Sequence, residues 1–163
     1  GGIIQIKQTV KTDLFSTSTT GDTLDVTGVT VTITPTRSDS KIFVMVSGYY
    51  GNDNNDSFAH LFLARSIGGG TVDNTIAIGD ARGSTTRATM SAALRNGGGA
   101  SDNVARYFGC QFLDSPSTTS SVEYKLRILV TQGTPAVIGG ADSDSDSNRG
   151  SYPTFITAME VSA

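Results

Sequence analysis

Acidic residues alternate with serine in one stretch of the sequence, and this pattern is the one best suited to metal binding. Asp142, Asp144 and Asp146 are separated by single serines, so carboxylate oxygens recur at alternate positions. Calcium prefers oxygen ligands, but an EF-hand loop also needs glycine at its sixth position and glutamate at its twelfth. Ser147 and Pro153 stand there instead. The calcium match is therefore partial, and a solvated acidic loop is the favoured interpretation.

Residues that could catalyse a reaction are sparse. His60 is the only histidine, it lies within an apolar run, and no nucleophile motif such as G-x-S-x-G accompanies it. A polysaccharide hydrolase would need two carboxylates about 5–10 Å apart. Glu123 and Glu160 are the only glutamates, and the 13 aspartates lie mostly in turn-like segments. We therefore expect no catalytic residues, no cofactor and no enzymatic activity.

Four arginines lie close together in the sequence, at Arg82, Arg87, Arg95 and Arg106. Scattered surface charge is the favoured interpretation. Two alternatives stay open: pairing with a carboxylate such as Asp114 across a subunit interface, or contact with an acidic glycan. Arginine suits either role because its planar guanidinium pairs bidentately with carboxylates.

The composition fixes the class of element that must position these residues. The chain of 163 residues contains 22 threonines, 19 serines and 19 glycines but only 2 glutamates and 4 lysines. Threonine fits pleated strands, whereas glycine and serine fit turns. This composition excludes a helical bundle, and no apolar run approaches the roughly 20 residues of a membrane-spanning helix. A net charge of −3 also argues against a nucleic-acid surface.

Alternating apolar residues predict the strands. Val29, Val31 and Ile33 alternate with threonines, and residues 122–131 show the same period of two, with valine, tyrosine, leucine and isoleucine on one face. A short strand is also expected over residues 74–80. Eight to ten antiparallel strands with turn residues between them are typical of an all-β sandwich or jelly roll. We expect residues 1–163 to form one such domain, the C-terminal part of a longer chain.

Two of the expected strands, residues 41–50 and 58–65, are apolar on both faces. A strand of this kind is buried on both sides, and a small single domain covers only one. We therefore expect the second face to pack against other copies in a closed homotrimer. The candidate interface residues are Phe43, Met45, Tyr49, Phe58, His60 and Phe62.

Several stretches of the sequence are similar to a known family of domains. They read GGIIQIKQTVKTDLFSTST, VTGVTVTITPTRSDSKIFVMVSG, IGDARGSTTRAT, FLDSPSTTSSVEYKLRILV and SYPTFITAMEVSA. They resemble C-terminal domains of fibre and other virion structural proteins in tailed bacteriophages, especially marine and cyanobacterial ones. The resemblance implies a trimeric jelly roll, similar in shape to complement and tumour-necrosis-factor heads, displayed on the virus particle. It also implies contacts with other virion proteins.

Polar loops are the expected place for any contact with a host glycan or protein. Loops on a rigid scaffold commonly carry binding residues. The candidates are Asn52, Asp53, Asn55, Asp102, Asp142, Asp144, Asp146 and Asn148. The competing hypothesis is a soluble carbohydrate-binding or polysaccharide-depolymerising domain, because tyrosines such as Tyr49, Tyr107 and Tyr152 could stack on sugar rings.

Overall fold

The protein is described by a computed structural model that covers residues 1–52, 56–95, 104–141 and 147–163. These residues form ten β-strands and no helix, which confirms the all-β prediction. No helix in the described part of the chain is long and apolar enough to cross a membrane. The strands are β1 (Ile3–Lys11), β2 (Phe15–Thr17), β3 (Thr23–Ile33), β4 (Lys41–Asn52), β5 (Asp56–Ile67), β6 (Met90–Arg95), β7 (Ala105–Asp114), β8 (Val122–Gln132), β9 (Ala136–Ile138) and β10 (Thr154–Val161).

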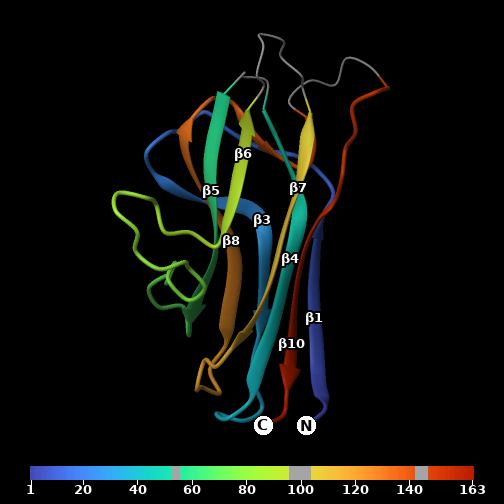
Figure 1. Ribbon diagram of the computed structural model, residues 1–163. Helices are drawn as coiled ribbons and strands as arrows, with labels where there is room; N and C mark the ends of the chain where they lie inside the picture. Colours follow the sequence, from blue (N-terminus) through green and yellow to red (C-terminus); the bar gives the residue numbers. More distant parts are fainter. Residues whose placement is uncertain (53–55, 96–103, 142–146) are drawn as a thin grey trace.

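The strands are arranged in two antiparallel sheets (Figure 1). In sheet A, β10 and β7 pair with opposite edges of β4, and β1 pairs with the free edge of β10. The short strands β9 and β2 extend sheet A beside the last residues of β4. Sheet B has the order β3-β8-β5-β6. Most pairs therefore join strands that are far apart in the sequence.

The core lies between the two sheets. The predicted inward face of β8, from Val122 to Val130, is at most 1% exposed at every second residue. Val29, Val31 and Ile33 on β3 are buried as predicted, and they join residues of sheet A such as Ile156 in one hydrophobic cluster. The period of two in these strands therefore identifies the core correctly.

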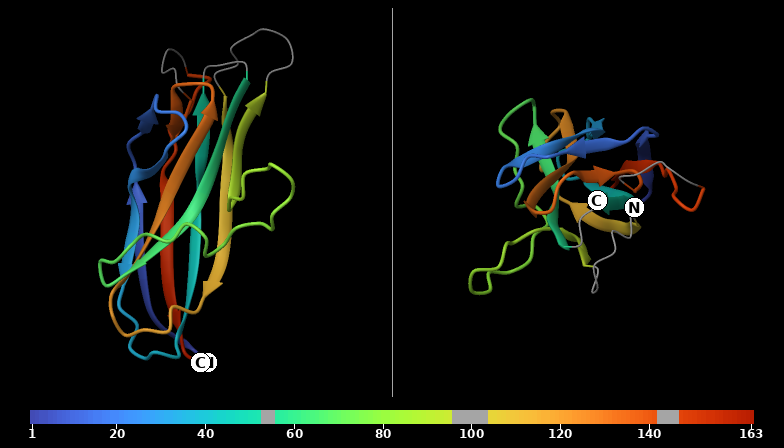
Figure 2. Two further views of the ribbon diagram at one scale, coloured as in Figure 1. Left: turned by 90° about the vertical axis from the view of Figure 1, so that its left-hand side faces the viewer. Right: turned by 90° about the horizontal axis from the view of Figure 1, so that it is seen from above.

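The outward side of β5 is partly covered by the chain itself. Phe62 is only 7% exposed and Ala64 is fully buried, although both point away from the core. Residues 68–89, between β5 and β6, run beside this side of sheet B (Figure 2). In this segment Asn74 accepts a hydrogen bond of 3.0 Å from Arg127, the residue paired with Phe62. The expectation that this second apolar face needs another chain is therefore wrong for Phe62 and Ala64.

This covering predicts unequal effects for two phenylalanines on the same strand. Phe62→Ala should lower the free energy of unfolding by about 3 kcal/mol, because it removes a buried ring. Phe58→Ala should lower it by about 1 kcal/mol or less, because Phe58 is 36% exposed. Urea denaturation at one fixed protein concentration measures both. Equal losses would show that residues 68–89 do not cover Phe62 in solution.

The strand expected over residues 74–80 does not form. Pairing with β5 is limited to an isolated bridge between Arg65 and Asp73. The Asp73 carboxylate then accepts hydrogen bonds from the backbone N–H of Thr75, at 2.7 Å, and from its hydroxyl, at 2.6 Å. Such an aspartate-centred turn bends the backbone away from the strand direction. Alternation of Ile76 and Ile78 alone was therefore a misleading signal.

The two chain ends meet at one end of the molecule (Figure 1). The backbone N–H of Ser162 donates to the carbonyl of Gly2 at 3.0 Å, and the N–H of Gly2 donates to the Ser162 hydroxyl at 2.9 Å. β4 ends and β5 begins at the opposite end of the molecule (Figures 1 and 2).

Candidate functional site

Apolar side chains gather on the outer face of sheet A. Residues directly opposite each other in an antiparallel pair share a face. Ile6 on β1 lies opposite Met159 on β10, which itself lies opposite Phe43 on β4. Phe43 lies in turn opposite Leu113 on β7. A row of four apolar side chains therefore crosses the sheet, and its two ends, Ile6 and Leu113, are 56% and 53% exposed.

The same face continues along the strands towards the end distant from the termini. Val10 lies opposite Phe155, and Tyr49 lies opposite Tyr107. Lys41 is the one charged residue among the outward positions described on β1, β10, β4 and β7, and its ammonium donates to Ser115 at 2.7 Å. We call this surface the apolar face. Its apolar residues are Ile6, Val10, Phe43, Met45, Tyr49, Tyr107, Leu113, Phe155 and Met159.

The outer face of sheet B has the opposite character. Lys125 forms ion pairs with Asp25 at 3.1 Å and with Glu123 at 2.9 Å. Arg127 adds a third ion pair with Asp25 at 2.8 Å. Sheet B thus presents charged side chains to water, whereas sheet A presents mostly apolar ones, with the uncharged Gln8, Thr157 and Gln111 between its apolar rows. Large contiguous apolar patches on soluble proteins mark interaction sites, so the apolar face is the candidate functional site.

The structure separates the six predicted interface residues into two groups. Phe43, Met45 and Tyr49 lie on β4 and belong to the apolar face. The other three lie on β5, on the outward side of sheet B, where Phe62 is already covered. His60 is half-buried there, and burial lowers the pKa of its imidazole. Only the first group is contiguous with a large exposed apolar surface.

Three tyrosines form a cluster at one end of the apolar face. The Tyr49 ring is stacked on Tyr152 with a centroid distance of 4.3 Å, and Tyr107 meets it edge-on at 5.9 Å. We call these residues the tyrosine cluster. Tyr50 is not part of it, because its ring is buried and its hydroxyl bonds that of Ser57.

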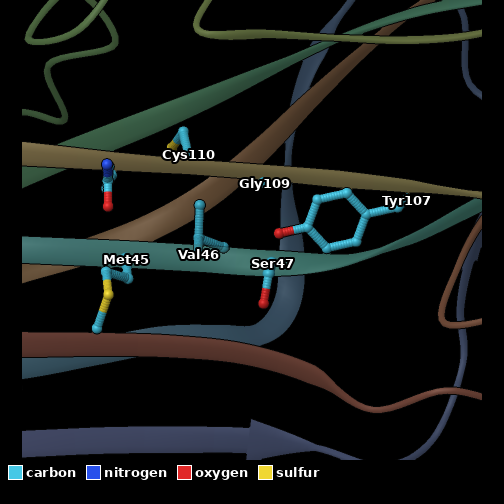
Figure 3. A pocket seen from close by; sticks show the side chains of 7 residues that line it. Met45, Val46, Ser47, Tyr107, Gly109 and Cys110 are labelled. Carbon is cyan, nitrogen blue, oxygen red and sulfur yellow. The ribbon is translucent and has the colours of Figure 1, made fainter.

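A shallow hollow of about 350 Å³ lies beside the tyrosine cluster, between β4 and β7 (Figure 3). The hydroxyl of Tyr107 points towards Ser47 and Gly109 (Figure 3). Met45 and Gln111 line the remainder of the hollow. No group of three or more His, Cys, Asp or Glu residues able to hold a metal ion occurs in the part of the chain that the structure describes.

The predicted receptor loops are covered only in part. Asn52 is 1% exposed, and its amide donates to the carbonyls of Gly133, at 3.0 Å, and Pro135, at 2.7 Å. The Asn52 side chain therefore links the end of β4 to the segment between β8 and β9. This corrects the prediction that Asn52 is exposed for receptor contact. Asn148 is exposed. The remaining candidates, Asp53, Asn55, Asp102, Asp142, Asp144 and Asp146, lie outside the described residues, and with them the calcium candidates.

A buried ion pair that the sequence reasoning missed joins the two sheets. A guanidinium nitrogen of Arg65 on β5 lies 2.7 and 2.6 Å from the two carboxylate oxygens of Asp114 on β7. Tyr124 on β8 donates to the same carboxylate at 2.6 Å. Burial and the adjacent Asp114 charge raise the pKa of Tyr124. Within one chain, Asp114 thus pairs with Arg65.

Glu160 is the second buried acid, and its position argues against the hydrolase hypothesis. It is fully buried, and its carboxylate accepts hydrogen bonds from Gln5 at 2.6 Å and from the backbone N–H and hydroxyl of Thr36 at 2.7 and 2.8 Å. Glu123 lies on the outer face of sheet B, paired with Lys125. The two glutamates therefore share no cleft.

Glu160 should make the protein acid-sensitive. Burial raises the pKa of its carboxyl, but the hydrogen bonds from Gln5 and Thr36 outweigh this and hold the pKa at about 2, below the ordinary 4.5. The stabilisation is therefore complete above pH 4.5 and is lost as the pH falls towards 2. We expect the melting temperature to drop across this range, and Glu160→Gln to melt lower at pH 7 with a weaker pH dependence. If the melting temperatures of the unmodified chain and Glu160→Gln fell by the same amount as the pH is lowered, this prediction would be contradicted.

No protein-family model matches this chain, and no curated protein gives a significant match.

Proposed function

We propose that this chain is a structural protein of a phage particle and forms a homotrimeric jelly-roll head, either at the end of a fibre or as a decoration on the capsid. The virion role rests on the resemblance of the sequence to phage fibre domains. The apolar face carries the self-association part of the proposal, because it extends across four strands and has one charged residue among its described outward positions. A monomer would leave this surface in water. Packing against other copies buries it, and a closed cyclic assembly does so without an open-ended contact.

The size of the apolar face fits a stable interface. Its strands β1, β10, β4 and β7 contain 9, 8, 12 and 10 residues, and every second side chain points outward. The face thus offers about 20 side chains, against roughly 20–30 on each side of a standard protein interface. The polar outer face of sheet B is suited to remain in water.

The order of the strands supports the jelly-roll part of the proposal. Eight of the strands pair in the orders β1-β10-β4-β7 and β3-β8-β5-β6, and these are the orders expected of a jelly roll built from two Greek keys. On this proposal, the end of the molecule distant from the two termini faces a host glycan or protein. The carbohydrate-depolymerising alternative has less support, because Glu160 is buried whereas Glu123 lies on the outer face of sheet B.

Two experiments test the proposal. Native mass spectrometry of the purified chain should show a species of three chains. Antibodies against the chain should also decorate the surface of phage particles that carry its gene, in negative-stain electron microscopy. Particles that contain no such protein, detected by peptide mass spectrometry, would contradict the virion role even if the chain is trimeric.

A further inference from the structure

Two rings of the tyrosine cluster lie directly over glycines. A Cβ atom placed on Gly109 would be 2.7 Å from Cζ of Tyr107 and still closer to its hydroxyl oxygen. A Cβ atom on Gly150 would be 2.9 Å from Cε1 of Tyr152. Any side chain at either position would lift the ring, so glycine is required for the rings to lie flat on the backbone.

The flat rings form a preorganised surface. Tyr49 contacts both other rings, so the three aromatic groups fix one another's orientation. Tyr107 is nevertheless 67% exposed and Tyr152 37% exposed. A rigid, exposed aromatic surface loses little conformational entropy when a partner covers it, and tyrosine is among the residues that contribute most to interfaces.

Tyr107 occupies the corner between two surfaces. It lines the hollow on the apolar face with Met45 and Ser47, and it also lines a second hollow with Met90 and Phe108 on the flank formed by β6 and β7. Copies related by a threefold axis contact each other through two different surfaces of each chain. Tyr107 lies between the apolar face and the flank formed by β6 and β7, so it is positioned to take part in both of these contacts.

We propose that the tyrosine cluster is a contact between copies of this chain, and that Gly109 and Gly150 are the positioning residues that seat its rings for that contact. This inference rests on the proposed homotrimer. The occupant is a second copy because the cluster is continuous with the apolar face: Tyr49 and Tyr107 pair two residues beyond Ser47 and Gly109 on the same side of sheet A.

The test compares trimer dissociation for three variants by dilution in sedimentation velocity. Tyr107→Ser removes the exposed ring and should raise the dissociation constant at least tenfold. Gly109→Ala keeps every tyrosine but displaces the Tyr107 ring, so it should weaken the trimer in the same direction. Gly79→Ala is the matched control, because a Cβ atom there meets nothing within 4 Å, and it should dissociate like the unmodified chain. A Tyr107→Ser trimer within twofold of the unmodified chain overturns the inference.

A second readout does not depend on the stability of the variants. Hydroxyl-radical footprinting should show Tyr107 protected in the unmodified trimer and labelled in a monomer made by Leu113→Lys. Equal labelling in both overturns the inference, as does protection that appears only when a soluble oligosaccharide is added. If the unmodified chain is a monomer, the proposed function itself fails. If it is a trimer that tolerates Tyr107→Ser, the inference alone fails.

Discussion

Replacing Leu113 or Ile6 by lysine is expected to convert the trimer into folded monomers. Both side chains are more than half exposed in the isolated chain, so lysine should change the stability of the monomer by less than about 0.5 kcal/mol. In the trimer the same lysine would place an unpaired charge in a desolvated contact, which costs several kcal/mol. Sedimentation velocity measures the loss of the trimer, and circular dichroism verifies that the fold is retained.

Phe58→Lys is the matched control for these variants. Phe58 is also an exposed apolar residue, at 36%, but it lies on the outward side of sheet B. We expect this variant to remain trimeric. If Phe58→Lys dissociates the trimer and Leu113→Lys does not, the copies meet through sheet B and the apolar face has been assigned wrongly.

Removing the buried acid between the sheets should cause the largest loss of monomer stability. Asp114→Ala leaves the Arg65 guanidinium, whose side chain is 18% exposed, without its carboxylate, and it also frees the Tyr124 hydroxyl. Breaking a buried ion pair by removing one partner costs roughly 3–5 kcal/mol. We expect this loss in urea denaturation in the monomeric Leu113→Lys background, where dissociation does not contribute.

An exposed ion pair in the same protein provides the control for Asp114→Ala. Arg37 and Asp39 lie 2.8 Å apart with side chains 65% and 52% exposed. Solvent screens such exposed pairs, so they contribute little to stability, and Asp39→Ala should have a small effect. If Asp39→Ala and Asp114→Ala lowered the free energy of unfolding equally, burial of the Arg65–Asp114 pair would make no additional contribution to stability.

The core was predictable because its signal is local. The inward residues of β8 alternate with Glu123, Lys125 and Arg127, so a period of two is readable without knowing the partner strands. The turn at Asp73 was missed because the carboxylate there competes with strand pairing, and this outweighed two alternating isoleucines. The run of asparagines and aspartates from Asn52 onward predicts a polar turn, but the Asn52 amide donates to the backbone carbonyls of Gly133 and Pro135.

The candidate site was predictable only on β4. Phe43, Met45 and Tyr49 share a face within one strand, so their spacing indicates a second apolar surface. Ile6 and Leu113 join this surface only through pairing across β10 and β4, and that register is not encoded in their local sequence. The same limit applies to Arg65 and Asp114, which lie in different sheets and meet only after the sheets pack.

Self-association through the apolar face is the central claim, and sedimentation equilibrium of the unmodified chain at micromolar concentration tests it most directly. The predicted result is a single species with three times the chain mass of 16.9 kDa. A species of one chain mass across the micromolar range would contradict the claim, because the apolar face would then be stable in water without a second copy.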